Sequence, residues 1–456
     1  MTRPTLTGTP DAVPTVELAE LVEGGNLEVI DRWLAQADVV EIADELSRLP
    51  REQRAVPFRL LPRDRALEVF ELLDPSLQQE LLEGLRDANV RQLFEDLDPD
   101  DRARLTEEMP AKVARRLLAG LSPNERRLTS TLLGYPEDSA GRLMSPEVAS
   151  LRAGISAADA LERLRRIGEG AETIYALPVT DDHRRLVGML GLRDLVLAPP
   201  EKPVGDLMDT EVFSARVDTD QEEVAQLARR YNLVEVPVVD VNRRLLGAIS
   251  AADVIDVIDE EATEDIQRLG GVGGDETVLD PPRQVFRTRL IWRLVNLGTA
   301  VLAASVIGLF ESSIHALATL AVFMPIVASM GGIATTQTAT VAIRGLAVGD
   351  LTRGILRRVL WKEVWLGLTT GAANGLVIAV IAYLWKGLWL LSVILGLAMV
   401  LNMLVAAVVG TLVPVALKTF RVDPAIASGV IITTFTDVCG FFSFLGLATL
   451  LIRFLL

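Results

Sequence analysis

Asp437 is the side chain whose position most limits what the protein can do. It lies about midway along the stretch 424–452, which carries no other charge. A lone carboxylate in hydrocarbon is costly unless it faces water or a cation. A structural Asp that is hydrogen-bonded to Thr433, Thr434 and Thr436 is the alternative. We favour an ion path, because the apolar stretches contain no Lys or Arg that could neutralise this acid.

Small and polar residues interrupt a second apolar stretch, 312–343. They are Gly331, Gly332, Thr335, Thr336 and Gln337. Glycine permits a broken helix, and Thr or Gln can supply oxygen ligands beside a cavity. Close helix packing through small residues is the alternative. We expect these residues to line the same path as Asp437. Asn402, in a third stretch, is a candidate for a hydrogen bond across helices.

A third group of candidates is acidic and lies in the sequence ADVIDVIDEEATEDIQRL at 252–269. On a helix Asp253, Asp256 and Glu260 would share one face, where like charges repel. Acids also crowd the segment LFEDLDPDDRARLTEE at 93–108. Solvated helix faces would account for both segments. Divalent cations that bridge them are the alternative, since Mg²⁺ prefers carboxylate and water oxygens.

Composition narrows the function classes. One Cys excludes an intramolecular disulfide, and the presence of only two His argues against a multi-histidine metal centre. The first 270 residues carry a net charge of −21 and the remainder +5, an acidic front half that argues against nucleic acid and suits cations. The chain has no G-x-x-x-x-G-K-[ST] motif, and we expect no enzymatic activity. Its start also lacks the pattern of a cleavable signal peptide.

A 12-residue repeat follows residues 1–15, which are rich in Thr and Pro and expected to be disordered. Its apolar positions are Leu49, Leu61, Leu73, Leu85, Leu97, Met109 and Leu121. Most are followed within two residues by Pro, which the first turn of a helix accepts and the interior does not. The repeat predicts an α-helical superhelical array over 16–134, with an irregular helical bundle as the alternative.

A second repeat has a step of 59 residues and pairs Gly188 with Gly247 and Asp194 with Asp253. Each copy contains a capped amphipathic helix, a β-rich run, a turn, a second strand and a second helix. The two copies, PVTDDHRRLVGMLGLRD and PVVDVNRRLLGAISAAD, resemble tandem α/β cystathionine-β-synthase (CBS) domains. We place these domains at 135–200 and 201–258.

In the CBS family a G-x-x-[ST]-x-x-D segment can bind the ribose and phosphates of an adenine nucleotide. Gly247, Ser250 and Asp253 match this segment in the second copy. In the first copy Gly191 replaces the hydroxyl residue. Nucleotide binding and a purely structural role therefore both remain open.

Five apolar stretches follow, each long enough to cross about 30 Å of hydrocarbon. We expect spans at about 291–310, 314–345, 364–385, 388–417 and 424–454. Basic residues gather before the first span and in the loops after the second and fourth, whereas the opposite loops carry only Glu311 and Lys386. Because basic loops face the cytosol, we expect a cytoplasmic N-terminus and an extracytoplasmic C-terminus.

With these parts in place, the chain resembles the MgtE family of magnesium channels and transporters. The stretches that carry the resemblance are YPEDSAGRLM at 135–144, DEEATEDIQRLGGV at 259–272, AVFMPIVASMGG at 321–332, GTLVPVALK at 410–418 and VDPAIASGVIITTFTDVCG at 422–440. The resemblance implies a connecting, or plug, helix at 259–282 and a transmembrane domain at 283–456. It also implies a homodimer, surrounded by membrane lipid in a bacterial inner membrane, that takes up Mg²⁺.

The family's functional residues fall on the candidates above. By resemblance, Asp437 holds a hydrated Mg²⁺ in the pore. Regulatory Mg²⁺, which closes the pore when cytosolic Mg²⁺ is high, would bind Asp253, Asp256, Glu261, Glu264 and Asp265. Asp98 and Asp101 are our candidates in the N domain. Some members also bind ATP at the CBS domains, where Tyr175, Arg193 and Asp194 would be the contacts.

Two departures from the family pattern bear on function. Many members have G-G-N-x-G-x-Q where Ile333 and Thr335 stand here, so selectivity among Mg²⁺, Mn²⁺, Co²⁺ and Ca²⁺ stays open. Ala252 stands where an additional acid is common. The rival functions are a CBS-regulated carrier of another ion or osmolyte and a membrane-anchored nucleotide sensor without a pore. A buried Asp with no cationic partner argues against an anion carrier.

Overall fold

The computed structural model describes residues 18–24, 26–73, 75–84, 87–168, 171, 173–274, 276, 282–420 and 422–451. The segment 1–15 that we expect to be disordered lies outside the described residues. The chain divides into two compact units, Met1–Ile255 and Asp256–Leu456.

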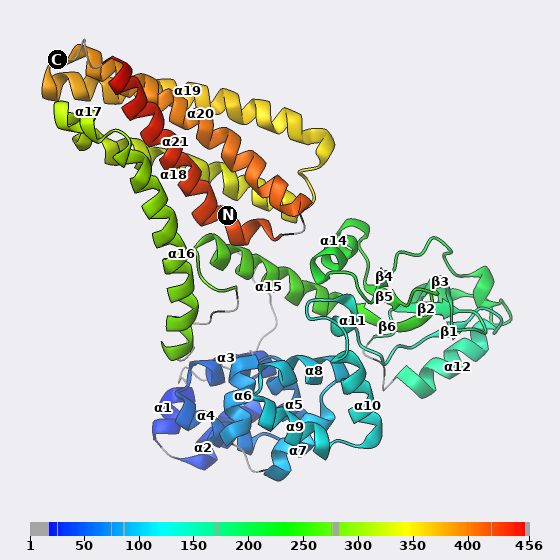
Figure 1. Ribbon diagram of the computed structural model, residues 1–456. Coiled ribbons are helices and arrows are strands. Elements are labelled where there is room, and N and C mark those ends of the chain that lie inside the picture. Colours follow the sequence, from blue (N-terminus) through cyan, green and yellow to red (C-terminus); the bar gives the residue numbers. More distant parts are fainter. Residues whose placement is uncertain are drawn as a thin grey trace. The chain divides into compact units, whose positions relative to one another are not determined.

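The first part of the N-terminal unit is a stack of short helices (Figure 1). They are α1 (Leu18–Glu23), α2 (Leu27–Gln36), α3 (Val39–Arg48), α4 (Arg51–Leu60), α5 (Arg63–Glu71), α6 (Pro75–Gly84), α7 (Asp87–Asp96), α8 (Pro99–Glu108), α9 (Ala111–Gly120) and α10 (Pro123–Leu132). The repeat positions Leu49, Leu61, Leu73, Leu97, Met109 and Leu121 are 1–8% exposed, and Leu85 lies outside the described residues. The stacked helical array that the repeat predicts is confirmed.

A second regularity joins these helices in pairs and escaped the sequence analysis. Arg54, Gln78, Arg102 and Arg126 recur at steps of 24 residues, twice the apolar repeat. Each side chain donates a hydrogen bond to the backbone carbonyl eight residues before it, at 2.8–3.2 Å. The carbonyls at a helix end lack partners within the helix. These side chains supply them, which is why Arg102 is tolerated at 1% exposure.

The two CBS copies complete the N-terminal unit, after the short helix α11 (Ala140–Leu143). The first copy contains β1 (Leu151–Arg152), α12 (Ala157–Ile167), β2 (Ala176–Thr180), β3 (Leu186–Gly191) and α13 (Leu192–Leu197), and the helical turn η2 (Val204–Asp206) follows. The second contains β4 (Ala215–Arg216), α14 (Gln221–Tyr231), β5 (Glu235–Val239), β6 (Leu245–Ser250) and α15 (Ala251–Leu269). Each sheet has one parallel and one antiparallel pair, with Val179 opposite Gly188 and Val238 opposite Gly247. The repeat of 59 residues is thus a structural repeat.

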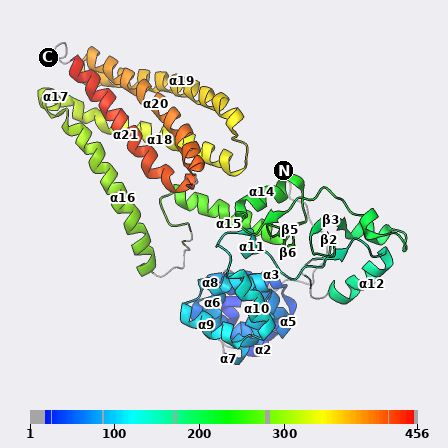
Figure 2. The same cartoon turned by 45° about the vertical axis from the view of Figure 1, so that its right-hand side comes forward.

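The membrane unit is a bundle of long apolar helices. Its helices are α16 (Pro282–Gly308), the short α17 (Glu311–Ala316), α18 (Thr319–Ala347), α19 (Arg353–Lys386), α20 (Trp389–Thr419) and α21 (Pro424–Leu450). Five are long and apolar enough to cross a membrane. Helix α20 is central and packs against α18, α19 and α21, which lie beside it in both views (Figures 1 and 2).

Helix α16 is peripheral to that bundle and packs mainly on α21. Only 6% of the most apolar part of α16 is buried, compared with 50% of the corresponding part of α20. Helix α15, which begins at Ala251, passes residue 259, where we place the start of the connecting helix.

Candidate functional site

Asp437 lies on α21 with its side chain half-buried. The three threonines that could hold a structural Asp use their hydroxyls elsewhere. Thr433, Thr434 and Thr436 donate to backbone carbonyls of α21 at 2.7, 2.6 and 2.9 Å. Within the part of the chain that the structure describes, the Asp437 carboxylate has no hydrogen bond and no ion pair. A carboxylate without donors suits a mobile cation better than a structural role.

The position of Asp437 is set by a close junction of three helices. Asn402 of α20 is fully buried, and its Nδ2 donates to the Val327 carbonyl of α18 at 2.8 Å. A Cβ added at Gly331 would overlap the Asn402 amide, and one added at Gly440 would lie 2.9 Å from Nδ2. Both glycines are therefore needed for α18 and α21 to approach α20 at this level.

This junction leaves one polar atom over. Asn402 Oδ1 is buried and has no hydrogen-bond partner among the described residues. Asn402 thus makes the hydrogen bond across helices for which the sequence makes it a candidate. Helix α18 runs unbroken through Gly331 and Gly332. Of the two alternatives for Gly331, the structure therefore agrees with close helix packing and not with a broken helix.

Of the other candidates on α18, one is buried in the bundle and the rest line an open groove. Thr335 is fully buried, and its hydroxyl donates to the Gly331 carbonyl at 2.8 Å. Thr336 donates likewise to the Gly332 carbonyl at 2.9 Å, and nothing lies within 4 Å of a Cβ added at Gly332. Gly332, Thr336 and Gln337 line an open groove of about 600 Å³, together with Ile333, Thr340 and Val341.

A second acid in the membrane unit, Glu363, was not predicted as a site residue from the sequence. It lies on α19 at 6% exposure, where it accepts a hydrogen bond from Thr338 Oγ1 at 3.4 Å and pairs with Lys362 at 2.9 Å. Its place at the edge of an apolar stretch made it look like a span boundary. Only the packing of α18 on α19 reveals that it is buried.

In the N-terminal unit, the predicted regulatory acids Asp98 and Asp253 lie within each other's field. Burial raises the pKa of Asp98, and the nearby Arg102 guanidinium opposes the shift. The carboxylates of Asp253 and Glu125 add to the rise. Asp253 also accepts hydrogen bonds from N and Oγ of Ser250, at 2.9 and 2.7 Å, at the start of α15. Two acids that are distant in sequence are thus electrostatically coupled.

Two further acids of this group were missed. The pKa of Glu71, at the end of α5, is raised to about 7, first by partial burial of its carboxyl group, although the residue as a whole is exposed, and then by Asp101 and Asp98. Burial also raises the pKa of Glu147, with additions from Glu125 and Asp98. Neither stands in an acidic run, so no local sequence signal marks them. The repulsion that each of them experiences from Asp98 is a property of the fold.

The acids of the connecting region have cationic partners. Arg268 pairs with both Glu264 and Asp423. Burial raises the pKa of Asp265 and Asp423 adds to the rise, while Arg344 and Lys418 oppose it. Asp256 is exposed and Glu261 partly buried on the same helix.

The described residues do not form a preorganised metal-binding cluster. Among the described residues, no three His, Cys, Asp or Glu side chains gather closely enough to hold a metal ion. Mg²⁺ keeps several waters and is often bound through one or two carboxylates. A Mg²⁺ ion bound by one or two of the acids described here would need water to complete its ligand shell.

The three candidate nucleotide contacts share one edge of the first CBS sheet. Tyr175 is 70% exposed just before β2, and its carbonyl accepts a hydrogen bond from Leu192 N at 2.9 Å. Arg193 and Asp194 are exposed in the first turn of α13. Gly191, at the N-cap of that helix, offers no side chain, whereas Ser250 occupies the equivalent place in the second copy.

Comparison with known proteins places these features in a family. A model described as a divalent cation transporter matches residues 324–447, one for the MgtE intracellular N domain matches 37–138, and CBS models match 140–201 and 204–260. The magnesium transporter MgtE of Thermus thermophilus is 36% identical over 459 residues, which covers 96% of this chain and 98% of that protein. The chain belongs to the MgtE family. The family resemblance and multidomain fold class expected from the sequence are thereby confirmed.

Two other relatives agree with this assignment. The MgtE of Bacillus subtilis is 32% identical over 422 residues, covering 92% of this chain and 88% of that protein. A crystal structure of the cytosolic domain of a Mg²⁺ channel MgtE in complex with ATP has a TM-score of 0.50 and 36% identity. It covers 53% of this chain and 98% of that one. The five apolar helices and the relatives make this family member a multi-pass membrane protein.

Proposed function

We propose that this MgtE family member carries Mg²⁺ across the membrane past Asp437. The observation that carries the proposal is the state of that carboxylate, which lies in an apolar helix with every neighbouring threonine hydroxyl directed to backbone. Such an acid can exchange ligands with a passing hydrated cation. Inward movement of one divalent ion at 100 mV gains about 4.6 kcal/mol, so no ATPase is required.

The path is completed by a second copy. The groove of Gly332, Thr336 and Gln337 supports this view, because α18 exposes it on a surface that a single chain leaves uncovered. In a homodimer this groove and the Asp437 face of α21 would enclose one pore, with Gly331 and Thr335 holding its wall in place. The basic loops support a cytoplasmic N-terminus and an extracytoplasmic C-terminus.

Cytosolic Mg²⁺ closes the pore through the acids outside the membrane. Coupled fields at Asp98, Asp101 and Asp253 support this role, because a divalent cation relieves repulsion between carboxylates. Asp256, Glu261, Glu264 and Asp265 would contribute where α15 leads to the membrane unit. The transported ion and the regulatory ion are then one ligand at linked sites.

ATP is a second ligand of this protein in our proposal, bound at the first CBS copy. The shared edge of Tyr175, Arg193 and Asp194 supports it, since an exposed aromatic ring can stack on adenine and Arg can contact phosphate. Without a hydroxyl at Gly191, the nucleotide would bind through these side chains.

Uptake into liposomes tests the transport proposal. Purified full-length protein is reconstituted into liposomes that enclose a Mg²⁺-sensitive dye, and an inside-negative membrane potential is applied. Asp437→Ala should lower the initial rate at least about 100-fold, equivalent to about 2.7 kcal/mol. Glu311→Gln, at an acid whose side chain is 75% exposed outside the bundle core, is the matched control and should keep the rate. Equal uptake by all three proteins would move the ion path away from Asp437.

A further inference from the structure

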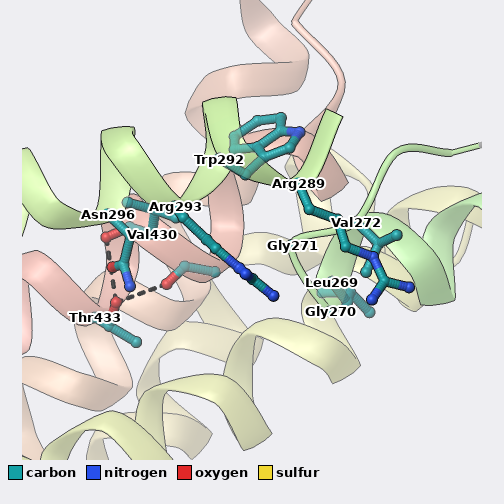
Figure 3. Close-up of a pocket in the computed structure, with 11 residues that line it drawn as sticks. Leu269, Gly270, Gly271, Val272, Arg289, Trp292, Arg293, Asn296, Val430 and Thr433 are labelled. Carbon is teal, nitrogen blue, oxygen red and sulfur yellow. Dashed lines mark hydrogen bonds between the residues drawn. The ribbon is translucent and has the colours of Figure 1, made fainter. Parts of the chain in front are cut away.

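A cavity of about 440 Å³ in the membrane unit takes no part in the function proposed above. Three elements border it: α16, the turn that follows α15, and α21 (Figure 3). Its main lining consists of Arg289, Trp292, Arg293 and Asn296 of α16, residues 269–272, and Thr433 of α21. Figure 3 shows the Arg289 and Arg293 side chains extending from one helix toward this space.

The cavity carries positive charge that the residues described by the structure do not fully balance. Arg289 is paired, with its Nε 3.2 Å from an oxygen of Glu276. The Arg293 guanidinium, the Trp292 indole N–H and the Asn296 amide have no hydrogen bond or ion pair within the described parts of the chain. Each of these groups can donate hydrogen bonds, and the Asn296 amide can also accept them. The unmet chemistry of the cavity is therefore that of an anion that can accept several hydrogen bonds.

The surface next to the cavity is apolar and uncovered. Leu294, Leu297, Val301 and Leu302 follow on α16 at 56–59% exposure. Trp side chains favour the membrane–water interface, and basic pockets beside membrane helices bind lipid headgroups. A ligand that matches this helix has a negatively charged head for the basic cavity and a hydrocarbon tail for the apolar surface beside it. A phospholipid has both.

We propose that this cavity binds the phosphate group of an anionic phospholipid whose acyl chains lie along α16. The lipid would hold the turn after α15 against α21, because both elements border the cavity. It would also offset the charge of Arg293 close to the ion path, since Thr433 precedes Asp437 by one helical turn, about 6 Å along the axis. Occupation would raise the rate of cation passage. Lipid binding rests on the membrane location alone, whereas the effect on rate rests on the cation transport proposed above.

Quenching of tryptophan fluorescence by brominated lipid tests binding directly. Full-length protein is placed in phosphatidylcholine vesicles with a minor fraction of brominated phosphatidylglycerol, or with brominated phosphatidylcholine at the same fraction. The signal of Trp292 is the difference between wild type and Trp292→Phe. It should be quenched more strongly by the anionic lipid, and Arg293→Gln should reduce that preference about fivefold. Arg357→Gln, at an exposed Arg outside the cavity, should keep it.

Three outcomes would overturn the proposal. Equal loss of preference in Arg293→Gln and Arg357→Gln would mean general attraction of basic residues to the membrane. Displacement of the brominated lipid by inorganic phosphate would assign the cavity to a soluble phosphate compound. Absence of quenching by either lipid, with two copies cross-linked through Leu297→Cys in a Cys439→Ser background, would make this face a subunit interface.

A transport measurement separates lipid binding from the ion path. Wild-type uptake should be faster in vesicles that contain phosphatidylglycerol than in phosphatidylcholine alone. Arg293→Gln should lose that dependence while still transporting, and Arg357→Gln should retain it. Lipid-independent uptake by wild type would contradict the proposed effect on rate. Failure of the Mg²⁺ proposal would instead abolish uptake in every lipid and leave the quenching intact.

Discussion

In the N-terminal unit, burial raises the pKa values of Glu71, Asp98 and Glu147, and the fields of other carboxylates add to the rise. In the membrane unit, Asp437 has no ion pair or hydrogen bond within the described residues. Crowded acids respond to cation concentration, because each bound ion relieves repulsion among several groups. A lone acid binds one ion and releases it. The same side-chain chemistry thus suits sensing in one unit and passage in the other.

Helix packing produces this difference. The acids of the N-terminal unit lie on separate short helices and on CBS elements, so stacking brings them together. Asp437 is kept apart by a bundle in which Asn402 fills the space between two glycines. Each prediction below alters one side of this contrast.

Removing the charge of Asp437 without changing its shape should have the largest effect. Asp437→Asn should lower Mg²⁺ uptake about 100-fold, or about 2.7 kcal/mol in the barrier. The same change should raise the thermal stability of the bundle, because an Asp at a helix centre costs about 2.5–3.5 kcal/mol in the membrane. Uptake and thermal unfolding are measured on the same detergent preparations. An unchanged uptake rate, or a lower stability, would mean that Asp437 is structural after all.

The junction that positions Asp437 can be tested with two neighbouring glycines. Gly331→Ala places a methyl group against the Asn402 amide and should destabilise the bundle by about 1–3 kcal/mol. Gly332→Ala is the matched control, since nothing lies within 4 Å of the new methyl group, and should cost less than about 0.5 kcal/mol. Thermal unfolding of the two variants gives the comparison. Equal shifts would show that the junction is looser than described.

Much of the architecture follows from sequence periodicity. The 12-residue step with Pro after the apolar position predicts short stacked helices, because Pro restarts a helix and Leu must be buried. The 59-residue step predicts paired sheets in the same way. The step of 24 residues was missed, since Gln78 interrupts the series of Arg and the step becomes meaningful only when each side chain is seen on a carbonyl eight residues back.

The candidate site was predictable only where one residue is anomalous in its own neighbourhood. Asp437 stands out because charge is rare in an apolar stretch. Glu71 and Glu147 do not, because exposed acids are common and only tertiary packing brings them near Asp98. Glu363 was hidden for a related reason, as a charge at the edge of a span normally lies in water.

Coupling between the N domain and the second CBS copy is open to a double-mutant cycle. Asp98→Asn and Asp253→Asn each remove one charge, and Asn at 253 keeps the oxygen that accepts from Ser250. The Mg²⁺ concentration that half-protects residues 253–272 from protease should rise in each variant. The rise in the double variant should differ about fivefold from the product of the two single rises, for a coupling of about 1 kcal/mol. Glu201→Gln, at an exposed acid outside this group, should leave it unchanged. Additive effects of the two single changes would deny the coupling.

The smallest expected effect is a pH dependence that originates at Glu71. Burial is the first cause of its pKa of about 7, compared with an ordinary value of 4.5, and the acids Asp101, Asp98 and Glu68 add to it. Between these two values the folded unit binds more protons than the unfolded chain, so its stability falls as pH rises from about 4.5 to 7. Because the side chain keeps contact with solvent, screening makes the loss smaller than the shift alone implies.

Hydrogen exchange of α5 in full-length, Mg²⁺-free protein at pH 5 and pH 7.5 measures this effect, after correction for the intrinsic exchange rate. Local opening should be easier at the higher pH, and Glu71→Gln should flatten the difference because the glutamine is neutral throughout. Asp44→Asn, at an exposed acid on α3, is the control and should retain the wild-type slope. Added Mg²⁺ should stabilise α5 more at pH 7.5 than at pH 5, since the ion competes with protons for the same carboxylates. If the opening of α5 still depended on pH in Glu71→Gln, the titrating group would be another of the neighbouring acids.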